Sequence, residues 1–153
     1  MTPDRIRSTP LRLTLLLLAI FAVAAFGCMA VAYAVTKANI ESALEADLRQ
    51  TISDYRAIND TTDLLERLSE AAVQVDPDVR ILHYLPDHGA VLSNVTHFPP
   101  VSGVTVISAD VIDGNPDHLA ESYLALSARV GAGQLIVAQS RDQIVEMGEI
   151  FLT

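Results

Sequence analysis

The hydrophobic residues form one long uninterrupted block near the N-terminus, followed by shorter periodic segments. Between Leu13 and Val35 the chain has 23 residues without a charge, and Gly27 is the one strong helix breaker among them. Because about 20 apolar residues cross the hydrocarbon core of a bilayer, the block predicts a transmembrane helix over residues 13–35.

The polar region after this block begins with a helical pattern. Neither Pro nor Gly separates it from Val35, so we expect one continuous helix from about Leu11 to Ile58, about 70 Å long at 1.5 Å per residue. Five apolar residues at spacings of four, four, four and three mark one face of this helix. We interpret that face as a dimer and signalling surface, and packing on the domain's own sheet is a compatible alternative. Its residues are Ile40, Leu44, Leu48, Ile52 and Tyr55.

A second helix is predicted over Thr61–Gln74. Asp60 is placed to cap its N-terminus, leucines recur at helical spacing within it, and Pro77 stops it.

From Val79 onward the pattern changes from helical to extended. Strands are expected at residues 79–85, 90–95, 104–112, 122–130 and 134–140, separated by segments rich in Pro, Gly, Asp and Asn. Short turns between successive strands predict an antiparallel meander. The fold class is therefore α+β, with about five antiparallel strands and a helix covering one face of the sheet.

Charge gives the chain an orientation. Arg5, Arg7 and Arg12 precede the apolar block with only Asp4 against them, whereas residues 36–153 carry 7 Lys and Arg against 18 Asp and Glu, a net charge of −11. The positive-inside rule places residues 1–12 in the cytoplasm and residues 36–140 outside it as a separate domain. A domain of this charge repels phosphate, which excludes nucleic acid as a partner.

Two processing events compete with a membrane anchor. The sequence "AYA" at Ala32–Ala34 fits signal-peptidase cleavage after Ala34, which would release a secreted or periplasmic binding module, although the apolar core exceeds the usual 7–15 residues of a signal peptide. Lipidation of Cys28 is disfavoured by the bulky Phe26 beside it. As the only cysteine, Cys28 forms no internal disulfide and is expected to pack as a small residue of the helix.

The sequence offers few candidates for chemistry. Nucleophile-elbow, zinc-protease and paired-cysteine motifs are absent, so no catalytic residue is assigned. Asp113, Asn115 and Asp117 imitate the first ligands of a calcium loop, but His118 stands where that loop needs Gly, and a solvated turn explains the same residues.

Two weaker sets of polar side chains remain. Arg80, Tyr84 and Arg129 are strand residues that an anionic small ligand could contact, and outward-facing solubility is the alternative. His83 is expected to be a packed or a surface residue of its strand and not a ligand, while the four histidines together suggest acid sensitivity near pH 6.

Three segments, "RSTPLRLTLLLL", "YLPDHGAVLSN" and "LALSARVGAGQLIVAQSRDQIVEM", together with the order of elements, resemble the N-terminal input half of bacterial sensor histidine kinases. The resemblance implies an inner-membrane homodimer with a PAS-like sensor domain, a kinase module that binds ATP and Mg²⁺, and a cognate response regulator. Other receptor outputs share this layout. None of the four histidines precedes an acidic residue, so no kinase residue is carried over to this chain.

The last segment, residues 141–153, reads as the start of a further helix. Ser140 can cap it, Asp142 favours its first turn, and apolar residues recur at helical spacing after them. Together with the resemblance, this pattern predicts a helix that leads to a second transmembrane span and a receptor whose output half lies beyond Thr153.

Overall fold

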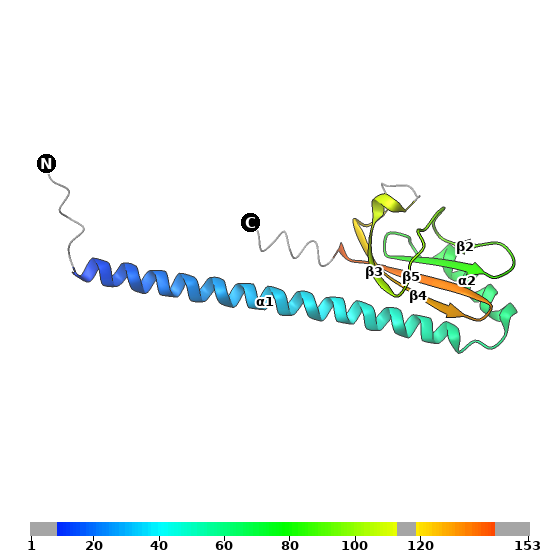
Figure 1. The fold of residues 1–153 in the computed structure, drawn as a ribbon, viewed down its shortest axis with the longest axis horizontal. Helices are drawn as coiled ribbons and strands as arrows, with labels where there is room; N and C mark the ends of the chain where they lie inside the picture. Colours follow the sequence, from blue (N-terminus) through cyan, green and yellow to red (C-terminus); the bar gives the residue numbers. More distant parts are fainter. Residues whose placement is uncertain (1–8, 113–118, 143–153) are drawn as a thin grey trace. The chain divides into compact units, whose positions relative to one another are not determined.

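The computed structural model describes residues 9–112 and 119–142. The chain divides into two compact units that meet between Asn39 and Ile40, and helix α1 contributes residues to both. Figure 1 shows the order of elements. They are α1 (Thr9–Arg56), α2 (Thr61–Gln74), β1 (Arg80–Pro86), β2 (Leu92–Ser93), β3 (Val104–Ser108), the 3-10 turn η1 (Ala109–Val111), β4 (Ser122–Val130) and β5 (Gly133–Ser140).

Helix α1 confirms the predicted continuous helix, since it runs from Thr9 to Arg56. Its apolar part exposes large side chains, such as Leu18 at 67% and Phe26 at 74%. By length and composition this is the one helix of the described residues that could cross a membrane, and a signal sequence would have the same properties.

Helix α2 has the predicted bounds because local signals fix both of its ends. The Asp60 carboxylate accepts a hydrogen bond from the Thr62 N–H at 2.8 Å. At the other end the Val75 N–H donates to the Ala71 carbonyl, and the next residues lead to Pro77.

The five strands form one antiparallel sheet in the order β2-β1-β5-β4-β3. The predicted pairing of successive strands is confirmed for β1 with β2, for β3 with β4 and for β4 with β5. It is wrong for β2 and β3, because the first strand pairs with the last instead, from Arg80 opposite Gln139 to Pro86 opposite Gly133. The burial of β1 and β5 explains this order. Each has four consecutive buried residues, so each needs a neighbouring strand on both sides and cover on both faces.

Two strands are shorter than predicted. Within residues 90–95, only Leu92 and Ser93 pair with β1. Beyond them, the Asn94 side chain forms hydrogen bonds with the backbone of β1. Its amide oxygen accepts from the Leu82 N–H at 2.9 Å, and its amide nitrogen donates to the Arg80 carbonyl at 2.8 Å. Strand β3 ends at Ser108, where η1 replaces the predicted extension to residue 112.

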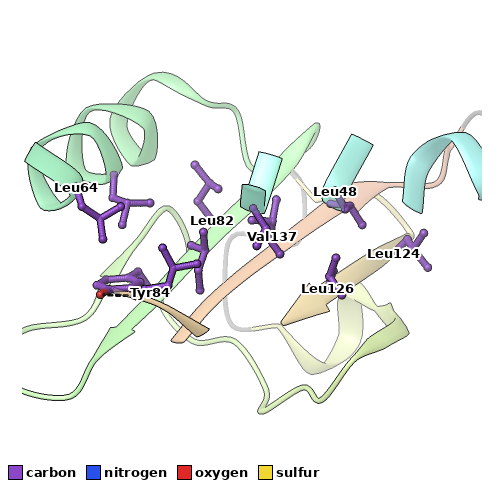
Figure 2. Packing of buried hydrophobic residues seen from close by; sticks show 11 residues of the cluster. Leu48, Leu64, Leu82, Tyr84, Leu124, Leu126 and Val137 are labelled. Atoms are coloured by element: carbon purple, nitrogen blue, oxygen red, sulfur yellow. Dashed lines mark hydrogen bonds between the residues drawn. The ribbon is translucent and has the colours of Figure 1, made fainter. Parts of the chain in front are cut away.

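The two faces of the sheet carry separate hydrophobic clusters, as the alternation of side chains along strands requires. Helices α1 and α2 cover the helix-side core, part of which Figure 2 shows. Its buried residues are Leu48, Ile52, Leu64, Leu68, Leu82, Tyr84, Leu124, Leu126, Val130, Leu135 and Val137. The loop-side core on the opposite face consists of Ile81, Phe98, Val101, Ile107, Ile112, Ala120, Tyr123, Ala125, Ile136 and Ala138.

The turn between β4 and β5 depends on two glycines. Gly131 has a φ of +56°, a conformation that residues with a Cβ rarely adopt. A Cβ added at Gly133 would lie 2.6 Å from the Tyr84 hydroxyl oxygen and 2.7 Å from the Leu85 carbonyl oxygen. Gly133 therefore lets the strand approach the buried Tyr84 side chain.

Candidate functional site

The best-defined polar cluster lies where α1 packs against the ends of β1 and β5. Arg80, the first residue of β1, makes an ion pair with Asp47 on α1. Its Nε donates to Gln139 Oε1 at 2.6 Å, and its Nη1 lies 3.5 Å from Thr51 Oγ1. The Arg80 side chain is only 26% exposed, so one guanidinium joins the helix to both central strands.

A second ion pair extends this cluster along α1. Arg141, which follows β5, donates from Nη2 to Glu41 Oε1 at 2.6 Å, and its side chain is 15% exposed. The Arg141 N–H also donates to the Ser122 carbonyl at 2.9 Å. We call these six residues the polar clamp: Glu41, Asp47, Thr51, Arg80, Gln139 and Arg141.

The clamp forms because the apolar stripe of α1 fixes how the helix lies on the sheet. Leu48 and Ile52 are buried in the helix-side core. Asp47 and Thr51 are four residues apart, so they occupy one row beside that stripe. Asp47 is half exposed, at 53%, so solvent weakens its attraction to Arg80. The clamp therefore stabilises the position of α1 mainly through directed, charge-assisted hydrogen bonds, and less through the attraction between opposite charges.

A groove of about 440 Å³ adjoins the clamp. Helix α1 supplies Asp54 and Tyr55 to its lining, helix α2 supplies Arg67 and Glu70, and β1 supplies Arg80. Burial raises the pKa of the Tyr55 phenol, and the guanidinium groups of Arg80 and Arg67 oppose that rise. The groove therefore combines a neutral hydroxyl donor with cationic and anionic side chains.

The three predicted ligand residues lie at separate places. Arg80 is opposite Gln139 and Arg129 is opposite Gln134, so the two arginines are five strand positions apart, about 17 Å at 3.3 Å per residue. Arg129 is exposed and pairs with Asp87. Of the three, only Arg80 lines the groove.

Tyr84 belongs to the helix-side core. Its side chain is 2% exposed, and its hydroxyl donates to the Val130 carbonyl at 3.2 Å (Figure 2). Burial raises the pKa of its phenol. Its hydrogen bond is structural, because it joins the side chain of β1 to the backbone at the end of β4.

The predicted dimer stripe packs on its own sheet. Leu48 and Ile52 are buried there, and Leu44 and Tyr55 pack against the same cluster. Ile40 is half-buried and lines a smaller pocket of about 240 Å³ next to Arg141. This is one of the two arrangements expected from the sequence, and it leaves the opposite face of α1 exposed.

His83 takes the packed one of the two strand positions expected for it. It lies on the loop side of the sheet with 6% exposure, its Nδ1 is 2.9 Å from Ser93 Oγ, and its ring centroid is 5.9 Å from that of Phe98. Burial lowers the pKa of His83, and the charge of His97 lowers it further. Both effects favour the neutral form of the imidazole.

The metal candidates Asp113, Asn115 and Asp117 lie outside the described residues, as does most of the predicted C-terminal helix at 141–153. Within residues 9–112 and 119–142 no three His, Cys, Asp or Glu side chains form a group that could hold a metal ion.

Sequence reasoning missed most of the clamp and the groove. Glu41, Asp47 and Arg141 belong to no motif, and Arg67 and Glu70 read as ordinary exposed positions of an amphipathic helix. A usable signal was available in the acidic residues that flank the apolar stripe of α1. Comparison with protein-family models, with curated proteins and with solved structures gives no match to this chain.

Proposed function

We propose that this chain is the signal-input module of a membrane-bound two-component histidine kinase, with its sheet domain as an extracytoplasmic sensor. One observation carries the proposal. Helix α1 includes the apolar segment and also, without a break, the turns that pack into the sheet domain and form the polar clamp. A change in how the domain holds these turns would reach the apolar segment through continuous helix.

The mechanism is a choice between two packings of α1 on the sheet. A stimulus acts by favouring one packing, and it shifts the equilibrium only by the difference in its affinity for the two. Arg80 and Arg141 are the contacts that such a shift would rearrange, because they join α1 to the start of β1 and the end of β5. Small displacements between packed helices are a known class of switching transition.

The remaining parts of the proposal rest on the resemblance to sensor histidine kinases. The α+β domain, with its antiparallel sheet and helices on one face, supports a PAS-like assignment. The kinase module, with ATP and Mg²⁺, would belong to the same polypeptide and would pass phosphate to a response regulator. The location would be the bacterial inner membrane with the N-terminus in the cytoplasm.

Signalling is tested with the product of the complete reading frame in membrane vesicles supplied with ATP and Mg²⁺. The proposal predicts an acid-labile phosphohistidine, and Arg80→Gln should change the rate at which it forms. Arg129→Gln is the matched control, because Arg129 also pairs with an Asp but lies outside the clamp. Absence of phosphohistidine refutes the kinase assignment, and equal rates in the two variants refute the role of the clamp.

The proposed homodimer would use the face of α1 that the sheet leaves exposed. Ala43 and Ala46 are exposed on that face, whereas Leu48 is fully buried. In a Cys28→Ser background, Ala46→Cys should crosslink two copies in membranes and Leu48→Cys should not. A chain that crosslinks at neither position contradicts the dimer.

The alternative fate of the apolar segment is removal as a signal peptide, which would leave a secreted or periplasmic binding module. The "AYA" sequence before Val35 favours this alternative. N-terminal sequencing of the protein from cells separates the two, because an anchored chain begins at Met1 or Thr2 and a cleaved chain begins at Val35.

A further inference from the structure

The groove between α1 and α2 has the features of a binding site for a small charged molecule. Both helices contribute one face to it, since Asp54 and Tyr55 are adjacent on α1 and Arg67 and Glu70 are one turn apart on α2. Its volume of about 440 Å³ lies in the usual range for ligand sites. Its polar groups decide which class of molecule it suits.

The cationic side of the groove has donors to spare. Arg67 is restrained only by a bond from its Nε to Asp63 Oδ1 at 3.4 Å, and its side chain is 63% exposed. An exposed pair of this kind contributes little and is easily replaced. Arg80, in contrast, is held in place by the clamp. Within the described residues the Tyr55 hydroxyl makes no hydrogen bond, so this donor is available near the two guanidinium groups.

The two carboxylates that line the groove are also available. Asp54 accepts a hydrogen bond from Gln50 at 2.7 Å, and neither it nor Glu70 has an ion pair within the described residues. The lining thus carries two cations and two anions. A simple anion would face Asp54 and Glu70, and a simple cation would face Arg67 and Arg80, so either would meet like charges.

From this balance we propose that the groove binds a small zwitterion, a molecule with one carboxylate and one ammonium group and no net charge. The carboxylate accepts hydrogen bonds from Arg67, Arg80 and Tyr55, and the ammonium donates to Asp54 and Glu70. A neutral molecule also escapes the long-range repulsion that the acidic domain exerts on anions.

The test is calorimetric titration of the full chain in detergent micelles with ω-amino acids of increasing charge separation: glycine, β-alanine, γ-aminobutyrate and 5-aminovalerate. We expect saturable binding of at least one of them. Butyrate and butylamine, which carry one charge each, should not bind at the same concentrations. Failure of all four zwitterions, or equal binding of butyrate, overturns the proposal.

Variants then locate the site. Arg67→Gln and Glu70→Gln should each weaken binding by about tenfold or more, the effect expected for losing one hydrogen bond to a charged group. Arg49→Gln is the matched control, because Arg49 is also about 60% exposed and pairs with a carboxylate four residues away, outside the groove. Equal binding by the Arg67 and Arg49 variants would refute this location. The titration needs no signalling output, so its failure is distinct from failure of the proposed function.

Discussion

The buried hydroxyl of Tyr123 provides a sharp test of the fold, because it joins three segments of the loop-side core. The side chain is 0% exposed. Its hydroxyl donates to the Pro77 carbonyl at 2.9 Å and accepts from the Ala120 N–H at 2.8 Å. Burial raises the pKa of Tyr123 to about 12. The phenol is therefore neutral at every pH at which the domain would be studied, and it acts as both donor and acceptor.

Tyr123→Phe removes this hydroxyl and leaves the ring in place. The Ala120 N–H then has no partner in a residue that is only 2% exposed, whereas the half-exposed Pro77 carbonyl can turn to water. Leaving the buried Ala120 N–H without a partner costs about 1–3 kcal/mol, and losing the hydrogen bond to Pro77 costs about 1 kcal/mol. We therefore expect the free energy of unfolding to fall by about 2–3 kcal/mol.

Tyr84→Phe is the matched comparison from the helix-side core. It removes one hydrogen bond, of 3.2 Å, to the Val130 carbonyl. Val130 lies opposite Gly133 at the β4–β5 turn, where the antiparallel ladder offers this carbonyl a backbone donor, so we expect a loss of about 1 kcal/mol or less. Thermal unfolding of the full chain in micelles, followed by circular dichroism, should show a fall in Tm on the order of 10 °C for Tyr123→Phe and a clearly smaller one for Tyr84→Phe. Equal effects would refute the reasoning from hydrogen-bond number and burial.

The remaining predictions concern the core, the hairpin and pH. Leu48→Ala should lower the free energy of unfolding by about 2–5 kcal/mol, the cost of truncating a fully buried leucine, in urea denaturation. Gly133→Ala should destabilise the β4–β5 hairpin and speed amide exchange there, because its Cβ meets the Tyr84 hydroxyl and a backbone carbonyl. The folded state lowers the pKa of His83, so the unfolded chain binds more protons below about pH 6.5 and stability should fall as pH decreases through that value. His83→Gln should reduce this fall in urea titrations at pH 7.5 and pH 5, and an equal fall in the variant and the original chain would contradict the role of His83.

The parts of the fold that follow from local signals could be predicted from the sequence. Helix α2 has the predicted bounds because Asp60 caps it and the chain turns before Pro77. Strand β4 also has its predicted bounds, since a loop and a glycine turn limit it on either side. The pairing of β1 with β5 was missed because it joins residues that are 47 to 59 positions apart in the sequence. Turn residues indicate only which strands that follow each other in the sequence can pair.

The sequence also could not predict where a side chain forms hydrogen bonds that a neighbouring strand would otherwise make. Asn94 ends β2 by bonding the β1 backbone at two points, and nothing in its own segment distinguishes it from an ordinary strand residue. Arg80 was singled out as a ligand candidate, but its partner Asp47 lies 33 residues earlier. The clamp depends on the rotation of α1 about its axis, which only the packing of Leu48 and Ile52 determines.

Arg80 connects the two proposals, because it belongs to both the clamp and the groove. Its bonds to Asp47 and Gln139 fix the position of α1 relative to the central strands, and the same side chain lines the groove. A zwitterion that drew the guanidinium toward Tyr55 would lengthen the bonds of the clamp, whereas one that fitted the present position would strengthen them. Binding therefore biases the packing of α1 only if the two packings hold Arg80 differently. A tenfold difference in affinity between them would supply about 1.4 kcal/mol, comparable to one charge-assisted hydrogen bond of the clamp.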